Sequence, residues 1–343
     1  VASLLRGFSA PVRLDYPATE ADLISLISHD SDGFNRWQAA QTYAARLLLR
    51  SVERSRAGDA PHRDKDLNGA IATVIEMSAD PAFTALAITL PSEADIAREI
   101  GEDVDPDAIH LAREALRKDI GQDLKDILLA TYARLAPDGP YSPDALAAGR
   151  RSLRNAALDL FAAGDEIEGA VLAMLQLEGT TTMTDEIAAL GVLAHIPGSE
   201  RENAFDAYYR AHEGEALVID KWFALQATIP ERGALDRVKT LMKHKAFSFN
   251  NPNRVRSLVG SFAAMNPTQF NAGDGSGYDF IAGIVLGLDG KNPQVAARLL
   301  SAFKSWRTME PKRRGLAEAA LRNVASAPDL SPDVKDIVQR SLA

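Results

Sequence analysis

The amino-acid sequence predicts an all-α protein, an irregular HEAT- or armadillo-like α-superhelix of about 16–18 helices with a short extended N-terminal segment. Apolar residues recur at helical spacing from Thr19 almost to the C-terminus, and alternating strand patterns are essentially absent after the first 14 residues. In the helix predicted over Leu217–Ala227, apolar side chains occupy two neighbouring faces, which is typical of a helix packed on both sides. No motif repeats at a fixed period, so a regular tetratricopeptide or ankyrin array is excluded.

Capping residues and prolines predict where the helices begin. Residues 1–14, which include Pro11-Val12-Arg13-Leu14, are expected to be extended. Thr19 is expected to cap the first helix, and Ser31 or Asp32 the second. Proline in a first turn costs nothing, because the N–H that it lacks would have no partner there. Further helix starts are predicted at Ser92, Asp105, Ser142, Thr182, Pro252, Pro293, Pro311 and Ser331.

The charge balance argues against nucleic acid as the main partner. The 343 residues have a formal net charge of -9. A surface that follows a phosphate backbone needs a dense basic stripe, and here the basic residues are scattered. The two basic clusters at residues 150–154 and 312–314 are expected to lie on solvated helix faces.

The composition also bears on the cellular compartment. The sequence has no cysteine, which excludes disulfides and thiolate metal sites and fits a reducing, cytoplasmic location. It has no apolar run of about 18 residues that would span a membrane and no signal-peptide pattern. It begins at Val1 without an initiator Met, which fits either processing or trimming of the chain or a fragment of a longer protein.

One segment stands out by its charge. Residues Arg237–Gly273 contain no Asp or Glu and carry six basic side chains: Arg237, Lys239, Lys243, Lys245, Arg254 and Arg256. A local positive surface on an acidic protein predicts a place where negative charge is bound.

The sequence lacks the common catalytic and metal-binding motifs, so no catalytic or metal-binding residue is predicted. No two of the six histidines are spaced i, i+4, and the nearest match to a zinc-protease helix, His212-Glu213-Gly214-Glu215-Ala216, has Ala where the second ligand would stand. The Gly-rich stretch at residues 272–277 follows no strand and lacks a phosphate-binding Lys, so it is interpreted as a flexible connection into a helix at Tyr278.

Candidate binding residues lie on two predicted helices. After Asn292-Pro293, Gln294 and Arg298 project one turn apart, together with Ser301, from the side opposite the apolar stripe. After Pro252, Arg254 and Arg256 flank the apolar stripe on opposite sides, so both cannot point into one cavity. The residues alone favour two solvated arginines and do not decide which one faces a ligand.

Several segments closely resemble the C-terminal domain of the bacterial aminopeptidase N family, zinc aminopeptidases with the gluzincin fold. The resemblance covers nearly the whole chain, and the segments follow the order of the family. They include Ser3-Leu4-Leu5-Arg6-Gly7-Phe8-Ser9-Ala10-Pro11-Val12, Phe34-Asn35-Arg36-Trp37-Gln38, Met183-Thr184-Asp185-Glu186-Ile187, Val218-Ile219-Asp220-Lys221-Trp222-Phe223, Asn250-Asn251-Pro252-Asn253-Arg254-Val255-Arg256, Asp274-Gly275-Ser276-Gly277-Tyr278 and Asn292-Pro293-Gln294-Val295-Ala296.

The resemblance implies a role without catalysis. Residues 1–14 would be the remnant of a preceding β-sandwich domain and residues 15–343 the C-terminal superhelical domain. The zinc, its His-Glu-x-x-His motif and the other catalytic groups would belong to the catalytic domain of the same polypeptide, so no cofactor is expected on this chain. The superhelix would enclose the substrate chamber and contact the distal, C-terminal part of the peptide. Arg256, Arg298 and Gln294 are the substrate-binding residues that the resemblance implies.

A second hypothesis stays open. The chain would be a free-standing HEAT-like scaffold that binds an acidic protein partner through the surface of residues 237–273. The two hypotheses differ in whether the reading frame upstream of Val1 encodes a His-Glu-x-x-His motif.

Overall fold

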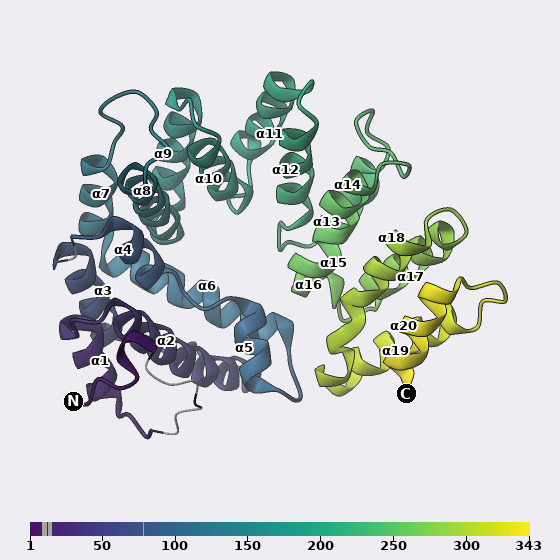
Figure 1. The fold of residues 1–343 in the computed structure, drawn as a ribbon, viewed down its shortest axis with the longest axis horizontal. Coiled ribbons are helices and arrows are strands. Elements are labelled where there is room, and N and C mark those ends of the chain that lie inside the picture. The colour runs from purple at the N-terminus through teal and green to yellow at the C-terminus, as the bar shows by residue number, and fades with distance from the viewer. Residues whose placement is uncertain (9–11, 13–15, 78) are drawn as a thin grey trace. The chain divides into compact units, whose positions relative to one another are not determined.

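The computed structural model describes residues 1–8, 12, 16–77 and 79–343. These residues are helical almost throughout (Figure 1). They include no β-strand; one isolated parallel bridge joins Val104 and Met309. The prediction of an all-α chain is therefore confirmed.

The chain divides into two compact units. The first comprises residues 1–96 and 108–196, and the second comprises residues 97–107 and 197–343. Helices α5 and α6 each contribute to both units, because residues 97–107 lie at the end of one and the start of the other.

The first unit packs its helices in neighbouring pairs. Helix α8 is central, because α4, α7, α9 and α10 all pack against it, while α1 packs on α2 and α3. The helices with residues in this unit are α1 (Glu20–His29), α2 (Gly33–Arg56), α3 (Lys65–Met77), α4 (Pro81–Ile88), α5 (Glu93–Ile100), α6 (Pro106–Asp123), α7 (Lys125–Arg134), α8 (Ala145–Gly164), α9 (Glu166–Gly179) and α10 (Met183–Ala194).

The second unit contains both candidate binding segments. Its elements are α11 (Ser199–His212), α12 (Ala216–Ala227), α13 (Ala234–Leu241), α14 (Pro252–Val255), η2 (Arg256–Gly260), α15 (Ser261–Met265), α16 (Pro267–Phe270), α17 (Ser276–Asp289), α18 (Pro293–Leu300), η3 (Ser301–Thr308), α19 (Pro311–Ala325) and α20 (Pro332–Leu342). Helix α12 packs against α11, α13 and η2. The expectation that this helix is covered on more than one side is confirmed.

Most predicted helix starts are observed. Thr19 caps α1 in a capping box with Asp22, and Asp32, not Ser31, caps α2. Thr182 caps α10 and Ser331 caps α20. Each of these side chains accepts a hydrogen bond from a backbone N–H of the first turn, which would otherwise have no partner.

Three details differ from the expectation. The helix predicted at Ser142 is capped two residues later, by Asp144. The described residues contain 20 α-helices, more than expected, because prolines and a π-helical turn divide residues 252–270 into short segments. Near the N-terminus Arg6–Phe8 form a short 3-10 turn, η1, and the part of the expected extended segment at residues 9–11 and 13–14 lies outside the described residues.

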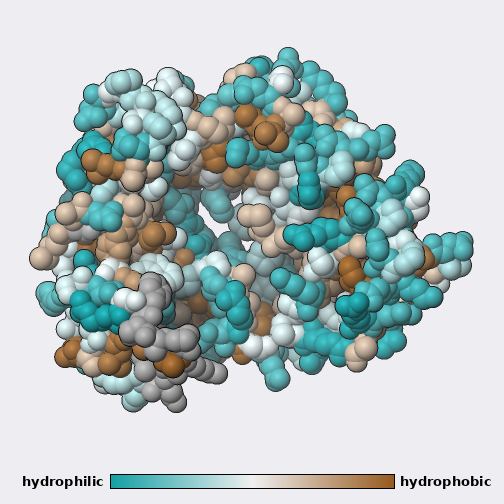
Figure 2. All heavy atoms as spheres, in the orientation of Figure 1, coloured by the Kyte–Doolittle hydropathy of each residue, from teal (hydrophilic) through white to brown (hydrophobic). Residues whose placement is uncertain are grey.

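The visible face is mostly hydrophilic, with hydrophobic side chains scattered over it (Figure 2). Among the helices of the described residues, none is both long and apolar enough to cross a membrane.

Candidate functional site

The three predicted substrate-binding residues all have exposed side chains. Arg256 opens η2, and Gln294 and Arg298 lie one turn apart on α18. Element η2 is π-helical, and the N–H of Ser261 donates to the carbonyl of Arg256, five residues earlier. Turns of this kind are rare and occur often at functional sites. The spacing of apolar residues in the sequence does not predict such a π-helical turn, because a single wide turn leaves this spacing nearly unchanged.

The two candidate segments lie on elements that pack together. Element η2 packs against α18, and α17 lies beside α18 (Figure 1). The contact is close at Gly260, where an added Cβ would lie 3.8 Å from Cβ of Arg256 and 3.9 Å from Cδ2 of Leu299. Leu299 directly follows Arg298 in the sequence, so Arg298 lies one residue from this contact with η2.

The charges of these two arginines are not neutralised within the described part of the chain. The Arg256 side chain donates a hydrogen bond to the Oδ1 of Asn253, and no carboxylate of the described residues pairs with Arg256 or Arg298. Exposed guanidinium groups without a carboxylate partner can bind an incoming anion, with two parallel donors each.

Arg254 has a different role from Arg256. Its side chain is buried, its Nε donates to the Ala246 carbonyl at 2.9 Å, and its Nη1 donates to the Ala216 carbonyl at 2.7 Å and also pairs with Asp220. The guanidinium also lies 5.7 Å from the centre of the Phe223 ring. Because its donors are used to join three segments of the second unit, Arg254 is a structural residue. Of the two arginines, only Arg256 has an exposed side chain.

The positive surface predicted over residues 237–273 is smaller than expected. Arg237 pairs with Glu202, and Lys245 lies 3.0 Å from Glu213. Both of these carboxylates come from outside the acid-free segment. Lys239 lies 3.9 Å from Asp236. The segment contains no acid, but the fold supplies carboxylates from elsewhere in the sequence. Of the six basic side chains, Lys243 and Arg256 are the two for which the described residues provide no carboxylate.

A cavity of about 310 Å³ lies where the loop before α14 meets α17 and the start of α18. Its lining includes Asn250 and Asn292, and Gly283 and Gly287 contribute bare backbone from α17. Asn292 also caps α18, because its Oδ1 accepts the N–H of Val295 at 3.2 Å. The cavity therefore adjoins the first turn of the helix that carries Gln294 and Arg298. The i, i+4 glycines were the sequence signal that could have predicted it.

The described residues provide no metal centre. They contain no group of three or more His, Asp or Glu side chains that could hold a metal ion. His212 ends α11, with its Nδ1 3.1 Å from Oε1 of Glu215. The Gly-rich stretch leads into α17, which starts at Ser276, two residues before the predicted Tyr278.

The chain is similar in sequence to a family of ARM-repeat domains and to bacterial aminopeptidases. A family model described as "Domain of unknown function (DUF3458_C) ARM repeats" matches residues 20–343. Aminopeptidase N of Caulobacter vibrioides is 39% identical over 345 residues, and aminopeptidase N of Escherichia coli is 36% identical over 346 residues. Each match covers 100% of this chain and 39% of the relative, so the chain spans about two fifths of the length of these relatives.

A solved structure extends the similarity to the fold. The crystal structure of Legionella pneumophila aminopeptidase A in complex with aspartic acid matches with a TM-score of 0.87 and 26% sequence identity. That match covers 98% of this chain and 40% of the other chain.

Proposed function

This chain belongs to the DUF3458_C family of ARM-repeat domains, and we propose that it is the non-catalytic C-terminal domain of a zinc-dependent aminopeptidase N. In this proposal it encloses the substrate chamber and contacts the distal, C-terminal part of a peptide. The zinc catalytic domain of the same polypeptide removes the N-terminal residue. We also keep a cytoplasmic location as part of the proposal, because the sequence contains no cysteine.

The observation that carries the proposal is the contrast between Arg254 and Arg256. Arg254 is buried and paired with Asp220, whereas Arg256 is exposed and has no carboxylate partner among the described residues. Arg298 is exposed on the element that packs against η2. Two such guanidinium groups, with the Gln294 amide one turn from Arg298, suit the carboxylate at the end of a peptide.

The described residues do not fit a zinc ion, so no catalytic step is assigned to them. The chemistry that they can perform is binding and orientation. A carboxylate held by Arg256 and Arg298 restricts the position of the peptide, and a substrate held in a productive orientation reacts faster than one that is free to move.

The test compares two substrate classes in the longer polypeptide that contains the catalytic domain. Arg256→Gln and Arg298→Gln should each lower kcat/KM for a tripeptide about tenfold, as expected when one charged contact at a wet site is lost. The same variants should leave hydrolysis of a small aminoacyl amide within about twofold, because this substrate has no distal carboxylate. Arg322→Gln, which removes an exposed arginine of α19, is the matched control.

Equal losses on the two substrates would show that the arginines do not bind the carboxylate. The isolated chain, mixed with zinc and an aminoacyl reporter, should not turn over above the buffer rate. Turnover would contradict the assignment of catalysis to another domain.

The alternative, a scaffold for an acidic protein, is less well supported. It depends on the positive surface of residues 237–273, and Arg237, Lys245 and Arg254 already have carboxylate partners there. The remaining unpaired charge on this segment is too small for the dense basic surface that an acidic partner would require.

A further inference from the structure

A second cavity of the second unit is separate from the candidate substrate residues. It measures about 450 Å³ and lies between α11, α12 and α13. Neither Arg256, Gln294 nor Arg298 lines it. A concave space of this size with aromatic walls and a few polar groups has the usual character of a small-ligand site.

Three aromatic rings form one wall of this cavity. The ring centres of Tyr209 and Trp222 are 5.0 Å apart, those of Tyr209 and His244 are 4.7 Å apart, and those of Trp222 and His244 are 5.2 Å apart. Trp222 is fixed in place by its indole N–H, which donates to the Phe205 carbonyl at 2.9 Å. The wall is therefore a rigid surface on which a ring or a large apolar group can pack.

The carboxylates at the cavity are already paired. Glu231 accepts two hydrogen bonds from Arg201, at 2.9 and 3.0 Å. Glu202 pairs with Arg237 and with Arg201, and the Arg237 guanidinium holds the pKa of Glu202 below its usual range. Asp206 lies 3.8 Å from Arg210. An incoming cation would have to displace an arginine from Glu202 or Glu231.

The polar capacity that remains consists of hydrogen-bond donors. The Gln226 side chain is 4% exposed, and its Oε1 accepts from Arg237 at 3.2 Å, which fixes the orientation of the amide. Its Nε2 is then left without a partner in the described part of the chain. A buried N–H without an acceptor is unfavourable, so a ligand that supplies the acceptor is favoured.

His244 and Arg232 add two further donors. The N–H of Ala246 donates to the His244 Nδ1 at 3.2 Å, so the neutral imidazole carries its hydrogen on Nε2. Burial and the neighbouring Lys245 lower the pKa of His244, which favours this neutral form near pH 7. Arg232 is exposed at the cavity, and none of the described carboxylates pairs with it.

We infer that this cavity binds a carboxylate attached to an aromatic ring, with the ring on the wall of Tyr209, Trp222 and His244 and the carboxylate near Gln226 and Arg232. Two sources share this chemistry: a free aromatic amino acid and the C-terminal aromatic residue of a peptide. The inference does not depend on the proposed function, because binding is measured on this chain without any enzymatic reaction.

The test titrates the 343-residue chain with four probes and follows binding by ligand-observed NMR. N-acetyl-L-phenylalanine should bind with an affinity in the millimolar range, as expected for so small a molecule. Its amide, which lacks the carboxylate, and N-acetyl-L-leucine, which lacks the ring, should each bind at least about fivefold more weakly. L-phenylalanine separates the two sources. Binding as tight as that of the acetylated form indicates a free amino acid, and much weaker binding indicates a peptide terminus.

Two substitutions locate the site. Gln226→Met and Arg232→Gln should each weaken the acid by about fivefold or more and leave the amide unchanged, while Arg322→Gln on α19 should change neither. Arg232 is exposed, so its substitution tests the site even where Gln226→Met alters folding. Equal affinity for the acid and the amide, no binding by any probe, or an unchanged affinity in Arg232→Gln would overturn the inference.

Discussion

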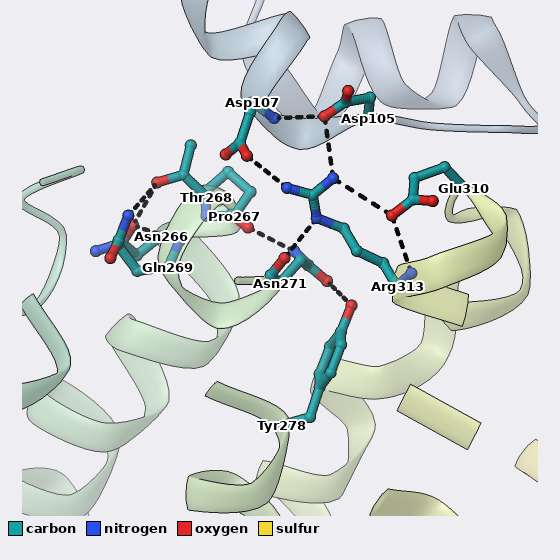
Figure 3. Close-up of polar contacts among 10 residues, drawn as sticks. All are labelled: Asp105, Asp107, Asn266, Pro267, Thr268, Gln269, Asn271, Tyr278, Glu310 and Arg313. Carbon is teal, nitrogen blue, oxygen red and sulfur yellow. Dashed lines mark hydrogen bonds and ion pairs between the residues drawn. The ribbon is translucent and has the colours of Figure 1, made fainter. Parts of the chain in front are cut away.

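The Nη1 of Arg313 lies 3.2 Å from Oδ1 of Asp105, although 208 positions separate the two residues in the sequence. Arg313 is 7% exposed, and its guanidinium also pairs with Asp107 and with Glu310 (Figure 3). Its Nε donates to the carbonyl of Asn271 at 2.6 Å. One side chain therefore joins residues 97–107, the loop after α16 and helix α19 within the second unit.

Arg313→Met should destabilise the second unit by about 3 kcal/mol. The substitution removes the Arg313 guanidinium from the half-buried carboxylates of Asp105 and Glu310, and breaking a buried ion pair from one side is costly. Urea denaturation followed by circular dichroism measures the change. Arg314→Met is the matched control, because this adjacent arginine is exposed and should change stability by no more than about 0.5 kcal/mol. Similar losses for both variants would show that the paired position of Arg313 is not what stabilises the unit.

The sequence predicted the local features of this fold well. The helix caps at Thr19, Asp32 and Thr182 are where the patterns placed them, and the apolar stripe predicted after Pro252 is buried. These features depend on residues within one or two turns, and a side chain at i, i+3 or i+4 is visible in the sequence itself.

Long-range ion pairs were predicted poorly. The sequence predicts Arg313 on a solvated face and a positive surface over residues 237–273. The fold instead pairs Arg313 with Asp105 and Arg237 with Glu202, and both carboxylates are far away in the sequence. Arg154 was also expected to be solvated, but its guanidinium lies 4.1 Å from the centre of the Tyr132 ring. A single sequence shows which charges are close along the chain but not which ones the fold brings together.

Gly277→Ala should destabilise the protein by about 2 kcal/mol or more. A Cβ at this position would lie 2.3 Å from the Phe270 carbonyl oxygen and 2.5 Å from that of Gln269, so the backbone would have to move. Gly283→Ala on the same helix, α17, is the control, since no atom lies within 4 Å of its Cβ position. It should stabilise the helix by about 0.5–1 kcal/mol, because alanine is the better helix former. Thermal denaturation of both variants should give shifts of opposite sign, and shifts of the same sign would contradict the close contact at Gly277.

Arg254→Met and Arg256→Met should have very different effects on the stability of the protein, although the two arginines belong to the same motif. Loss of Arg254 leaves Asp220 without its cation and removes one donor each from the Ala216 and Ala246 carbonyls, so we expect a loss of about 3 kcal/mol in the free energy of unfolding. Arg256→Met should change that free energy by no more than about 0.5 kcal/mol, because its side chain is exposed. Chemical denaturation measures both. The opposite order would mean that Arg256, and not Arg254, supports the fold.

The stability of the first unit should depend on pH through His110. Its Nδ1 lies 2.7 Å from Oε1 of Glu93. Burial alone would lower the pKa of His110, but the hydrogen bond and the negative charge of Glu93 outweigh burial and raise it; Glu114 adds to the rise and Arg113 opposes it. A histidine whose pKa is higher in the folded state binds its proton more tightly there, so protonation favours folding.

This contribution has a definite sign and pH window. It is fully present below the unfolded pKa of about 6.5 and is lost as the pH rises through the higher folded value. The free energy of unfolding of the native chain should therefore exceed that of His110→Gln by the largest amount near pH 6, and the difference should shrink towards pH 8. Denaturant titrations across this range measure it. In a Glu93→Gln background the His110→Gln substitution should no longer produce this trend, because the main group that raises the pKa of His110 is gone and burial then outweighs Glu114. A difference that grows with pH would show that burial, and not Glu93, sets the protonation of His110.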